Sequence, residues 1–588
     1  VDGLVIPGRS VIEHCQIVGE VARALIQRYP EPIRSAIFPA NSPLVAACHD
    51  IGKVSPTFVE KIRRACRSDP DASIPLDIES QWGGHAGVSQ VAARALKAPR
   101  WIPEILGQHH GFSPQLGGRR ADDEVFGGAS WQAERNALFS ELKARFGMEM
   151  EWPEIQSVRD ARLLAGLTTV ADWIGSGGPF EDPHQPWLDK IEAALNDAGF
   201  ISPTYISNLG FEQIFDFTPR PAQQTLIDAV QGSGVYVLEA PMGIGKTEAA
   251  LYVAYHLLQT HQATGIYFAL PTQLTSNRIY DRFNEFLGRI LDPKCHHRKA
   301  LLLHGKSWLQ DTEMGEEGRP GGDWFNHSKR GLLSPFAVGT IDQALMAAMN
   351  VKHGFVRAFG LAGKVVILDE VHSYDAYTGT LLDALVELLR GLHCTVIVLS
   401  ATLVRERRCK LLKCESHSSS YPLVTAIQNE TAVVELPAAP PPDHPVEVRL
   451  LNDEKLAIRE ALDRASEGQQ VLWIENTVMD AQNRFRDLAA RANDLGVSCG
   501  LLHSRYTAAD RQRIESHWVN MFGKEGRLHR GERGRILVGT QVLEQSLDID
   551  ADFLISRFAP TDMILQRIGR LWRHAETPRP ISACCETW

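Results

Sequence analysis

The stretch LEAPMGIGKTEAA limits the fold of this chain more than any other part of it. It follows a run of β-branched residues and precedes a helical pattern, which predicts a strand, a glycine-rich turn and a helix in succession. Ala240, Gly243, Gly245, Lys246 and Thr247 fit a phosphate-binding loop with alanine at its first glycine position. Backbone N–H groups of such a turn surround phosphates, the lysine contacts the β/γ oxygens, and the threonine hydroxyl binds Mg²⁺. The alternative is a glycine-rich turn without a ligand.

A pair of carboxylates follows another apolar run, in VVILDEVH. This run predicts a parallel strand that delivers Asp369 and Glu370 to its carboxyl end, where open α/β sheets bind their ligands. One carboxylate is needed to hold Mg²⁺ and a second to orient or deprotonate the attacking water. Two adjacent carboxylates without a function would repel each other at a cost. We therefore predict ATP hydrolysis with Mg²⁺.

The chain has 588 residues, which is too long for one hydrophobic core. Its pattern of apolar residues changes twice along this length. Residues up to about Asn208 have helical apolar spacing, whereas short β-branched runs alternate with helical patterns from Phe211 onward. A proline-rich stretch, Glu435 to Pro445, is typical of an extended linker. We predict an all-α domain over residues 1–208 and two α/β lobes with parallel sheets over 209–440 and 441–588.

The second lobe ends in QRIGRLWRH. Arg567 and Arg570 are three residues apart, so a helix would place them on one face. An arginine supplied across a cleft stabilises the charge on a γ-phosphate during its transfer. A solvated helix face is the alternative, but the ordered motifs that precede this helix favour a catalytic role.

These motifs resemble those of superfamily 2 helicases of the DExH type from Phe211 to His574. The resemblance implies two RecA-like lobes. It implies that Gln223 contacts the adenine and that Gln566 lies at the nucleotide. It also implies strand-binding and coupling residues in LPTQLTSNR, GTIDQAL, SAT and VGTQVLEQSLDID and after the Asp-Glu pair, namely Thr272, Gln273, Thr340, Asp342, His372, Ser400, Thr402, Thr540 and Gln545.

The helical domain carries histidines and aspartates that could bind metal. Its adjacent pair His49 and Asp50 is accompanied by further residues of the same kind in or beside apolar helical stretches, namely His14, His85, His109, His110 and Asp172. A buried histidine taken singly is more often a hydrogen-bonded core residue. The set itself contains no cysteine, which disfavours structural zinc and favours Fe, Mn, Co or Ni.

In this order the residues resemble the HD family of metal-dependent phosphohydrolases. The family pattern implies a first ion held by His49, Asp50 and Asp172 with His14, and a second held by Asp50, His85, His109 and His110. Two such ions activate a water molecule and stabilise the leaving oxygen of a phosphodiester. Lys53 would contact a phosphate oxygen, or else it is an ordinary cationic helix end.

The combination of both parts resembles the CRISPR-associated helicase–nucleases of type I systems, type I-E in particular. The resemblance implies 3′→5′ movement on single-stranded DNA, cleavage of that strand at the HD site, and recruitment to R-loop DNA by the Cascade surveillance complex. Candidate residues of a basic strand-binding groove are Arg278, Arg282, Lys352 and Arg357, for which a solvated surface is the alternative. Members of this group carry a further C-terminal domain, which we expect to be absent or truncated here.

The composition of the chain limits the classes of protein to which it can belong. The formal net charge is −10, so binding of nucleic acid requires local basic patches rather than a basic whole. No apolar run has the length of a membrane span, and the 10 scattered cysteines are typical of reduced thiols. We expect a cytoplasmic monomer that binds no membrane.

Three other functions are the alternatives to this interpretation. A DExH RNA helicase with a structural helical domain would bind no metal and would respond to RNA. An HD nucleotide phosphohydrolase with a regulatory ATPase module would act on small nucleotides. A non-enzymatic scaffold would need an inactive phosphate-binding loop, which Lys246 and Thr247 contradict.

Overall fold

The computed structural model describes residues 8–66, 82–116, 119–147, 152–303, 322–325, 330–371, 376–428, 433–443, 445–530, 533–544, 547–574 and 576–588. The chain divides into two compact units. The first consists of Val1–Glu239 and Lys246–Ala438, and the second of Ala240–Gly245 and Ala439–Trp588. The helical segment and the first α/β lobe therefore belong to one unit.

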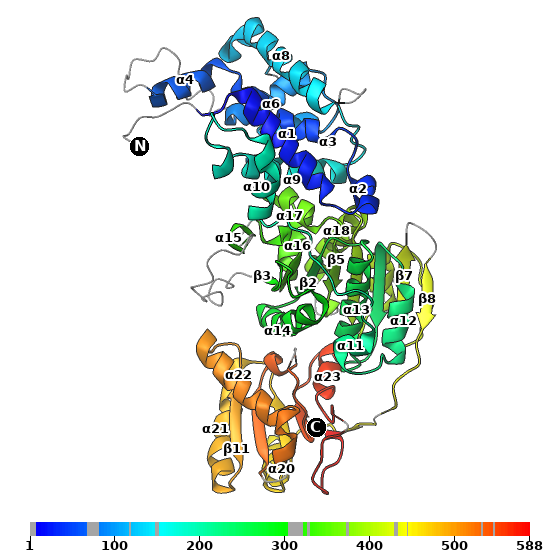
Figure 1. The fold of residues 1–588 in the computed structure, drawn as a ribbon. Helices are drawn as coiled ribbons and strands as arrows, with labels where there is room; N and C mark the ends of the chain where they lie inside the picture. The colour runs from blue at the N-terminus through cyan, green and yellow to red at the C-terminus, as the bar shows by residue number, and fades with distance from the viewer. Residues whose placement is uncertain are drawn as a thin grey trace. The chain divides into compact units, whose positions relative to one another are not determined.

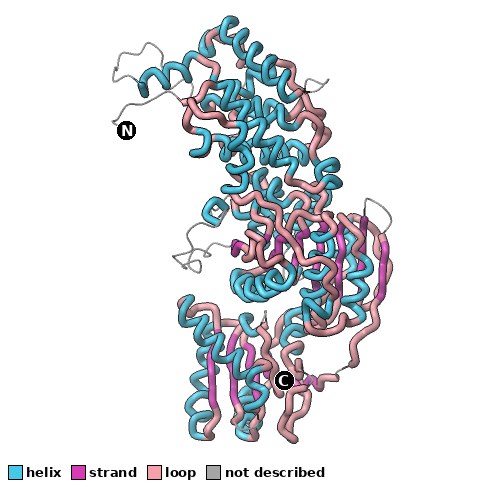
Figure 2. Tube along the Cα trace, viewed as in Figure 1, coloured by secondary structure: helices cyan, strands magenta, loops and turns pink. Residues whose placement is uncertain are grey.

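The described part of residues 8–208 is helical, as predicted (Figures 1 and 2). Helix α1 begins after a capping box in which Ser10 and Glu13 bond each other's backbone N–H groups. The α-helices are α1 (Val11–Gln27), α2 (Glu31–Ile37), α3 (Ser42–Ala47), α4 (Pro56–Cys66), α6 (Gly84–Ala95), α7 (Ile102–Gly107), α8 (Gly128–Phe146), α9 (Val158–Gly175) and α10 (Ile191–Asp197). Apolar residues of α1, α3 and α9 share one core, so these helices hold the residues between them in fixed positions.

The first lobe contains a sheet in the order β3-β4-β2-β5-β6-β1-β7-β8. Strands β1 to β6 run parallel, and β7 and β8 are antiparallel to their neighbours. The strands are β1 (Gly234–Glu239), β2 (Ile266–Leu270), β3 (Leu301–Leu303), β4 (Phe336–Thr340), β5 (Val365–Leu368), β6 (Thr395–Ser400), β7 (Leu423–Gln428) and β8 (Val434–Pro437). The central strands are buried along their whole length, which explains their continuous apolar sequences.

The first lobe also contains α-helices, several of which pack on its sheet (Figure 1). They are α11 (Phe211–Phe215), α12 (Pro221–Ala229), α13 (Lys246–Gln259), α14 (Gln273–Ile290), α15 (Gly322–Phe325), α16 (Ile341–Ala348), α17 (Gly354–Leu361), α18 (Ala376–Gly391) and α19 (Arg405–Leu412). Because β1 and β5 both run parallel to β6, they end at one edge of the sheet. The glycine-rich turn after β1 and Asp369 after β5 therefore leave the sheet at the same edge.

The second lobe contains a parallel sheet in the order β11-β12-β10-β13-β14-β9. Its strands are β9 (Glu447–Val448), β10 (Gln470–Ile474), β11 (Ser498–Leu502), β12 (Arg535–Gly539), β13 (Phe553–Ser556) and β14 (Glu586–Thr587). Its α-helices are α20 (Glu454–Ser466), α21 (Val478–Asp494), α22 (Ala508–Phe522) and α23 (Thr561–Ile568). The fold class predicted from the sequence, an all-α domain followed by two parallel-sheet lobes, is confirmed.

Two local predictions are corrected by the structure. The proline-rich stretch is not an extended linker throughout, because its first residues belong to β8, which pairs antiparallel with β7 at the edge of the first sheet. Proline is compatible with an edge strand because no partner needs its missing N–H. Arg357 is not an exposed groove residue, because it lies on α17 and is only 9% exposed.

That seam is formed by α9 and α17, which approach closely. A Cβ built on Gly166 of α9 would lie 2.4 Å from Cβ of Phe359 and 2.6 Å from the carbonyl oxygen of Phe355. No side chain fits at that position, so the glycine allows the two helices to touch. Arg162 of α9 also donates to the carbonyl oxygen of Ala347 at 2.6 Å.

Lys364, the residue immediately before β5, is buried and makes the free energy of unfolding depend on pH. Burial lowers the pKa of this ammonium group to about 7 from 10.5. Its Nζ donates to the carbonyl oxygens of Leu332, at 2.8 Å, and Ser334. Between those two pKa values the unfolded chain binds the proton and the folded protein does not, so stability rises with pH there and is lost as the pH falls toward 7.

We therefore predict that the unfolding free energy of the wild type minus that of Lys364→Met increases from pH 7 to pH 10.5. Below this window the difference should be flat, because the lysine is then charged in both states. Denaturant unfolding at stepped pH measures it. A constant difference across the window would mean that the folded protein keeps the proton.

Among the residues that the structure describes, no helix is long and apolar enough to cross a bilayer.

Candidate metal centre and nucleotide site

The His49-Asp50 pair lies in a kinked 3₁₀ segment, Cys48–Lys53, that continues from α3. The sequence suggested a regular helix, but Asp50 has φ −110° and ψ 20°, outside the helical region. This kink allows both side chains to face the same interior point. Gly52 permits the close approach of the segment to α6, since a Cβ there would lie 2.1 Å from the carbonyl oxygen of His85.

One oxygen of Asp50 faces a first group of ligands. Its Oδ2 lies 3.1 Å from Nε2 of His14 and 3.1 Å from Nε2 of His49. Oδ1 of Asp172, from the C-terminal turn of α9, lies 3.3 Å from Nε2 of His49 and 3.7 Å from Nε2 of His14. These four side chains come from α1, the kinked segment and α9, and their ligand atoms lie within 4.8 Å of one another.

The other oxygen of Asp50 faces the second group. Its Oδ1 lies 3.3 Å from Nε2 of His85, on α6, and 3.6 Å from Nε2 of His109, which follows α7. His110 joins them, with its Nε2 3.0 Å from Nε2 of His85. The structure thus brings together all seven side chains predicted to bind metal, and Asp50 lies between the two groups.

The backbone orients two of the imidazole rings toward the centre. Nδ1 of His49 donates to the carbonyl oxygen of Ala46 at 2.8 Å, and Nδ1 of His109 donates to that of Leu106 at 2.7 Å. Each ring therefore presents Nε2 inward, which is how partners behind metal-binding histidines fix the ring. These two Nε2 atoms and Oδ1 of Asp50 are buried and make no hydrogen bond within the described chain. Buried polar atoms normally have partners, so the set fits two cations.

Electrostatics supports the same interpretation. Burial lowers the pKa of His85 to about 4 and that of His109 to about 3, so both rings are neutral ligands at neutral pH. Burial also disfavours protonated His49, but Asp50 and Asp172 outweigh it and raise its pKa to about 10. The two carboxylates thus draw a positive charge into the centre, a role that a bound cation would take over.

Lys53 lies beside the pair. Its Nζ is 2.5 Å from Oδ2 of Asp50, and its side chain is 22% exposed. Burial disfavours its charged form, but the Asp50 carboxylate outweighs this and raises its pKa. The ammonium group is therefore charged and adjacent to the centre, as a contact to a phosphate oxygen requires.

The nucleotide-binding residues of the first lobe lie at the carboxyl edge of its sheet. Lys246 and Thr247 begin α13, directly after the turn that follows β1. Burial raises the pKa of Asp369, and the positive charge of Lys246 opposes this shift, which places the two groups near each other. Glu370 has φ 54°, and its N–H donates to Oδ1 of Asp369 at 2.9 Å. Lys246 and the two carboxylates thus lie near one another.

Other predicted residues of this lobe have structural partners. Gln223 is fully buried, and its Oε1 accepts from the N–H of Arg220 at 2.8 Å, so its predicted contact to adenine stays a prediction. Thr272 caps α14, with Gln273 the first residue of that helix. Thr340 precedes α16, whose first turn contains Asp342.

The SAT motif, Ser400 to Thr402, contains a hydrogen bond between its own residues. Oγ of Ser400 donates to the carbonyl oxygen of Thr402 at 2.8 Å. Among the groove candidates, Arg282 pairs with Glu248, and Lys352 is exposed. His372 and the side chain of Arg278 lie outside the described residues.

Arg567 makes its contacts within the second lobe. Its guanidinium donates to Glu544 at 2.7 Å, to Ser556 at 2.9 Å and to Asn476 at 3.0 Å, and the side chain is 1% exposed. Every guanidinium nitrogen of Arg567 is therefore engaged inside the lobe, and its contact to the γ-phosphate stays a prediction. The helix also ends at Ile568, so the assumed helical face does not extend to Arg570.

Arg570 is buried as well and donates to the carbonyl oxygens of Leu547, at 2.7 Å, and Glu544. Gln566 and Thr540 are buried in the same lobe. Their nucleotide and strand contacts stay predictions, and Gln545 lies outside the described residues.

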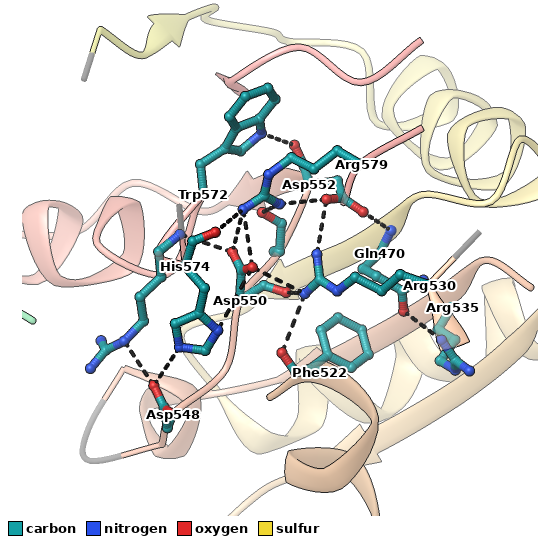
Figure 3. A network of polar contacts seen from close by, with 12 residues as sticks. Gln470, Phe522, Arg530, Arg535, Asp548, Asp550, Asp552, Trp572, His574 and Arg579 are labelled. Atoms are coloured by element: carbon teal, nitrogen blue, oxygen red, sulfur yellow. Dashed lines mark hydrogen bonds and ion pairs between the residues drawn. The ribbon is translucent and has the colours of Figure 1, made fainter. Parts of the chain in front are cut away.

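A buried ionic network in the second lobe was missed by the sequence analysis (Figure 3). Asp550 and Asp552, both fully buried, pair with Arg530 and Arg579. Asp552 also accepts from the backbone N–H of Gln470 at 2.7 Å, which ties the network to β10. Alternate aspartates in SLDIDAD were the available signal, since carboxylates between apolar residues need buried partners.

We predict that Arg530→Met destabilises the second unit by about 3–5 kcal/mol, because it leaves two buried carboxylates short of a counter-charge. Arg513, which is exposed and pairs with Asp510 at 3.2 Å, is the matched control, and Arg513→Ala should change little. Urea unfolding followed by tryptophan fluorescence, with limited proteolysis of the second unit, measures both. Equal effects of the two substitutions would contradict this prediction.

The centre and the two lobes define a class of protein, a metal-dependent phosphohydrolase of the HD type joined to a helicase motor. Family models match three parts of the chain: the Cas3 HD domain over residues 7–180, the DEAD/DEAH box helicase over 220–409, and the C-terminal part of the CRISPR-associated nuclease/helicase Cas3 over 467–576. The chain belongs to the Cas3 family of CRISPR-associated nuclease/helicases, and it is an enzyme with nuclease and helicase domains.

Individual relatives agree with this assignment. The chain is 33% identical to a Cas3 endonuclease/helicase of Thermus thermophilus, with 98% of this chain and 72% of the relative covered. It is 31% identical to the Escherichia coli protein, with 82% of this chain and 59% of the relative covered. The solved structure of T. fusca Cas3 with AMPPNP superposes with a TM-score of 0.86 at 30% identity, covering 100% of this chain and 75% of that one.

A chain in a structure described as a CRISPR RNA-guided surveillance complex, pre-nicking, matches with a TM-score of 0.73 at 28% identity. The match covers 98% of this chain and 71% of that one.

Proposed function

We propose that this chain hydrolyses ATP with Mg²⁺ to move 3′→5′ along single-stranded DNA and cuts that strand at the HD centre. The observation that carries the nuclease part is the position of Asp50, whose two oxygens face two different ligand groups at 3.1–3.6 Å. Such an arrangement suits two divalent transition-metal ions of the Fe, Mn, Co or Ni class, since every ligand is an imidazole or a carboxylate.

At the nuclease centre, bound ions would supply an activated water molecule and stabilise the charge on the leaving oxygen. The chain's own residues hold the ligand geometry. The backbone carbonyls behind His49 and His109 keep their Nε2 atoms directed inward. Lys53 supplies a cation beside Asp50 that can bind a phosphate oxygen of the strand.

At the motor, Lys246 binds the β/γ-phosphate oxygens, and Thr247 and Asp369 hold Mg²⁺. Glu370 orients the attacking water. Arg567 and Arg570 of the second lobe stabilise the charge on the γ-phosphate. Thr272, Thr340 and the neighbouring residues grip the sugar-phosphate backbone.

Contacts to the sugar-phosphate backbone do not distinguish one base from another. Recognition of an invader sequence is therefore delegated to a guide-RNA surveillance complex that presents R-loop DNA. The similarity to a chain of a surveillance-complex structure supports this partner.

Cleavage of circular single-stranded DNA tests the proposal, with Mn²⁺, Co²⁺, Ni²⁺ or Fe²⁺ and with or without ATP. Circular RNA and a nucleoside 2′,3′-cyclic phosphate serve as competing substrates. We expect DNA to be cut and its presence to stimulate ATP hydrolysis. Stimulation by RNA alone without bound metal would favour an RNA helicase, and cleavage of the small nucleotide alone would favour a nucleotide phosphohydrolase.

Direction is tested separately with partial duplexes that carry either a 3′ or a 5′ single-stranded arm, in a nuclease-inactive variant. Unwinding from the 3′ arm alone is expected. Unwinding from the 5′ arm would contradict the proposed direction.

A further inference from the structure

One segment of the first lobe lies directly against the loop that carries the second ligand group. Lys352 and His353 connect α16 to α17, and Gly111 immediately follows His110. A Cβ built on Gly111 would lie 2.7 Å from Cγ and 2.8 Å from Cε of Lys352, and 3.3 Å from Nε2 of His353. The aliphatic stem of Lys352 therefore lies along the backbone of Gly111, where φ is +124° and only glycine is unstrained.

The same segment also lies near the first ligand group. The ring of His353 is 5.5 Å from that of Trp173, the residue after Asp172. Helix α17, which begins at Gly354, packs tightly on α9, which carries Asp172. The first lobe thus contacts the chain next to a ligand of each group, so this segment has a fixed position relative to the whole centre.

The charge of Lys352 is not used by the protein itself. The side chain is exposed, and it forms no ion pair or hydrogen bond with any other residue that the structure describes. Lys53, by contrast, is paired with Asp50. An exposed lysine usually extends into solvent, but the stem of Lys352 is held against Gly111. A lysine whose stem is packed and whose ammonium has no partner can bind an anion from outside.

The segment also follows an element that is proposed to grip DNA. Helix α16 begins directly after Thr340 and ends at Ala348. Eight residues of α-helix span about 12 Å. One short element of the first lobe therefore joins the predicted strand contacts to the edge of the nuclease centre.

We propose that Lys352 contacts a backbone phosphate of the strand that enters the HD centre, beside the phosphate that is cut. The first lobe would then complete the substrate-binding site of the nuclease with a cation. A lysine ammonium is a point charge without base preference, which suits a strand that moves through the site. The inference rests on the proposed function, because it requires single-stranded DNA at this centre.

The test compares the whole chain with Lys352→Gln, Lys352→Arg and the control Lys294→Gln, an exposed lysine elsewhere on the first lobe. Three readouts are taken with the metal that supports cleavage. They are KM and kcat for a single-stranded oligonucleotide without ATP, the rate with bis(p-nitrophenyl) phosphate, and the salt dependence of oligonucleotide binding. Metal content and ATP hydrolysis report whether each variant folds.

For Lys352→Gln we expect a KM for DNA raised about three- to tenfold with kcat nearly unchanged, and an unchanged rate with the small phosphodiester. The slope of log K against log salt should fall by about 0.7, the value for one phosphate contact on a single strand. Lys352→Arg should restore both, and Lys294→Gln should match the wild type.

An unchanged KM and salt slope in Lys352→Gln would overturn the inference, and so would an equal loss with the small substrate, which would indicate a structural role. If the wild type cuts bis(p-nitrophenyl) phosphate but no DNA, the proposed function fails instead. In that case, if Lys352→Gln still lowers the slope of log K against log salt, Lys352 contacts DNA that the centre does not cut.

Discussion

Asp50→Asn should abolish metal-dependent cleavage of single-stranded DNA while leaving ATP hydrolysis intact. Asp50 is the residue whose two oxygens face both ligand groups, at 3.1 Å on one side and 3.3–3.6 Å on the other. Loss of a residue that only hydrogen-bonds to a metal ligand lowers metal affinity or activity by about 10–100-fold. Loss of a ligand shared by both groups should therefore lower them by more. Metal content per chain and cleavage of circular single-stranded DNA measure the effect.

The amide of asparagine has the shape of the carboxylate but no charge, so the substitution tests charge rather than space. Asp189, an exposed aspartate of the helical segment, provides the control, and Asp189→Asn should cut DNA as the wild type does. Retention of two ions and of cleavage in Asp50→Asn would contradict the assigned centre. Loss of both activities together would indicate misfolding, which the ATPase readout detects.

Lys246→Ala should reduce ATP hydrolysis by about 10²–10³-fold, the usual cost of removing one preorganised group that stabilises developing charge. Cleavage without ATP should remain, because the metal ligands all lie on other elements, between α1 and α9. Steady-state phosphate release, measured beside nicking of circular single-stranded DNA without ATP, distinguishes the two sites.

Lys299→Ala, at an exposed position of the same lobe, serves as the control for charge removal. Undiminished ATP hydrolysis in Lys246→Ala would place the nucleotide site elsewhere. If nicking without ATP disappeared together with ATP hydrolysis, the nuclease and the motor would not be separable in the way the ligand positions indicate.

Most of the architecture could be predicted because its strands are buried on both faces. Such strands are continuous apolar runs, and β1 and β5 were recognised from them. Strand β4, FAVGT, was missed because it is short and contains Gly339. Strand β8 was missed because its exposed pattern and its proline resemble a linker.

The metal ligands could be predicted as a set but not as a geometry. Their sequence separation gives no distance, and only the packing of α1, α6 and α9 brings His14, His85 and Asp172 to Asp50. The kink at Asp50 was not predictable either, because its backbone conformation depends on the close contact of Gly52 with α6.

Local periodicity is a poor guide where tertiary contacts decide whether a side chain is buried. Arg567 and Arg357 have the spacing of exposed cations in the sequence, yet both are buried. Arg567 satisfies Glu544 inside its lobe, and Arg357 lies on a helix that packs against α9. The pattern of charges along the chain does not show whether a buried residue of opposite charge lies on another helix or strand.

The sequence by itself thus determined the classes of element, the order of the motifs and the chemistry of each ligand, because these depend on residue type and short-range spacing. Only the tertiary structure decided which oxygen of Asp50 meets which histidine, which arginines are buried, and that Lys352 lies against Gly111. Those facts depend on contacts between residues far apart in the chain, and burial and pairing energies arise only when such contacts form.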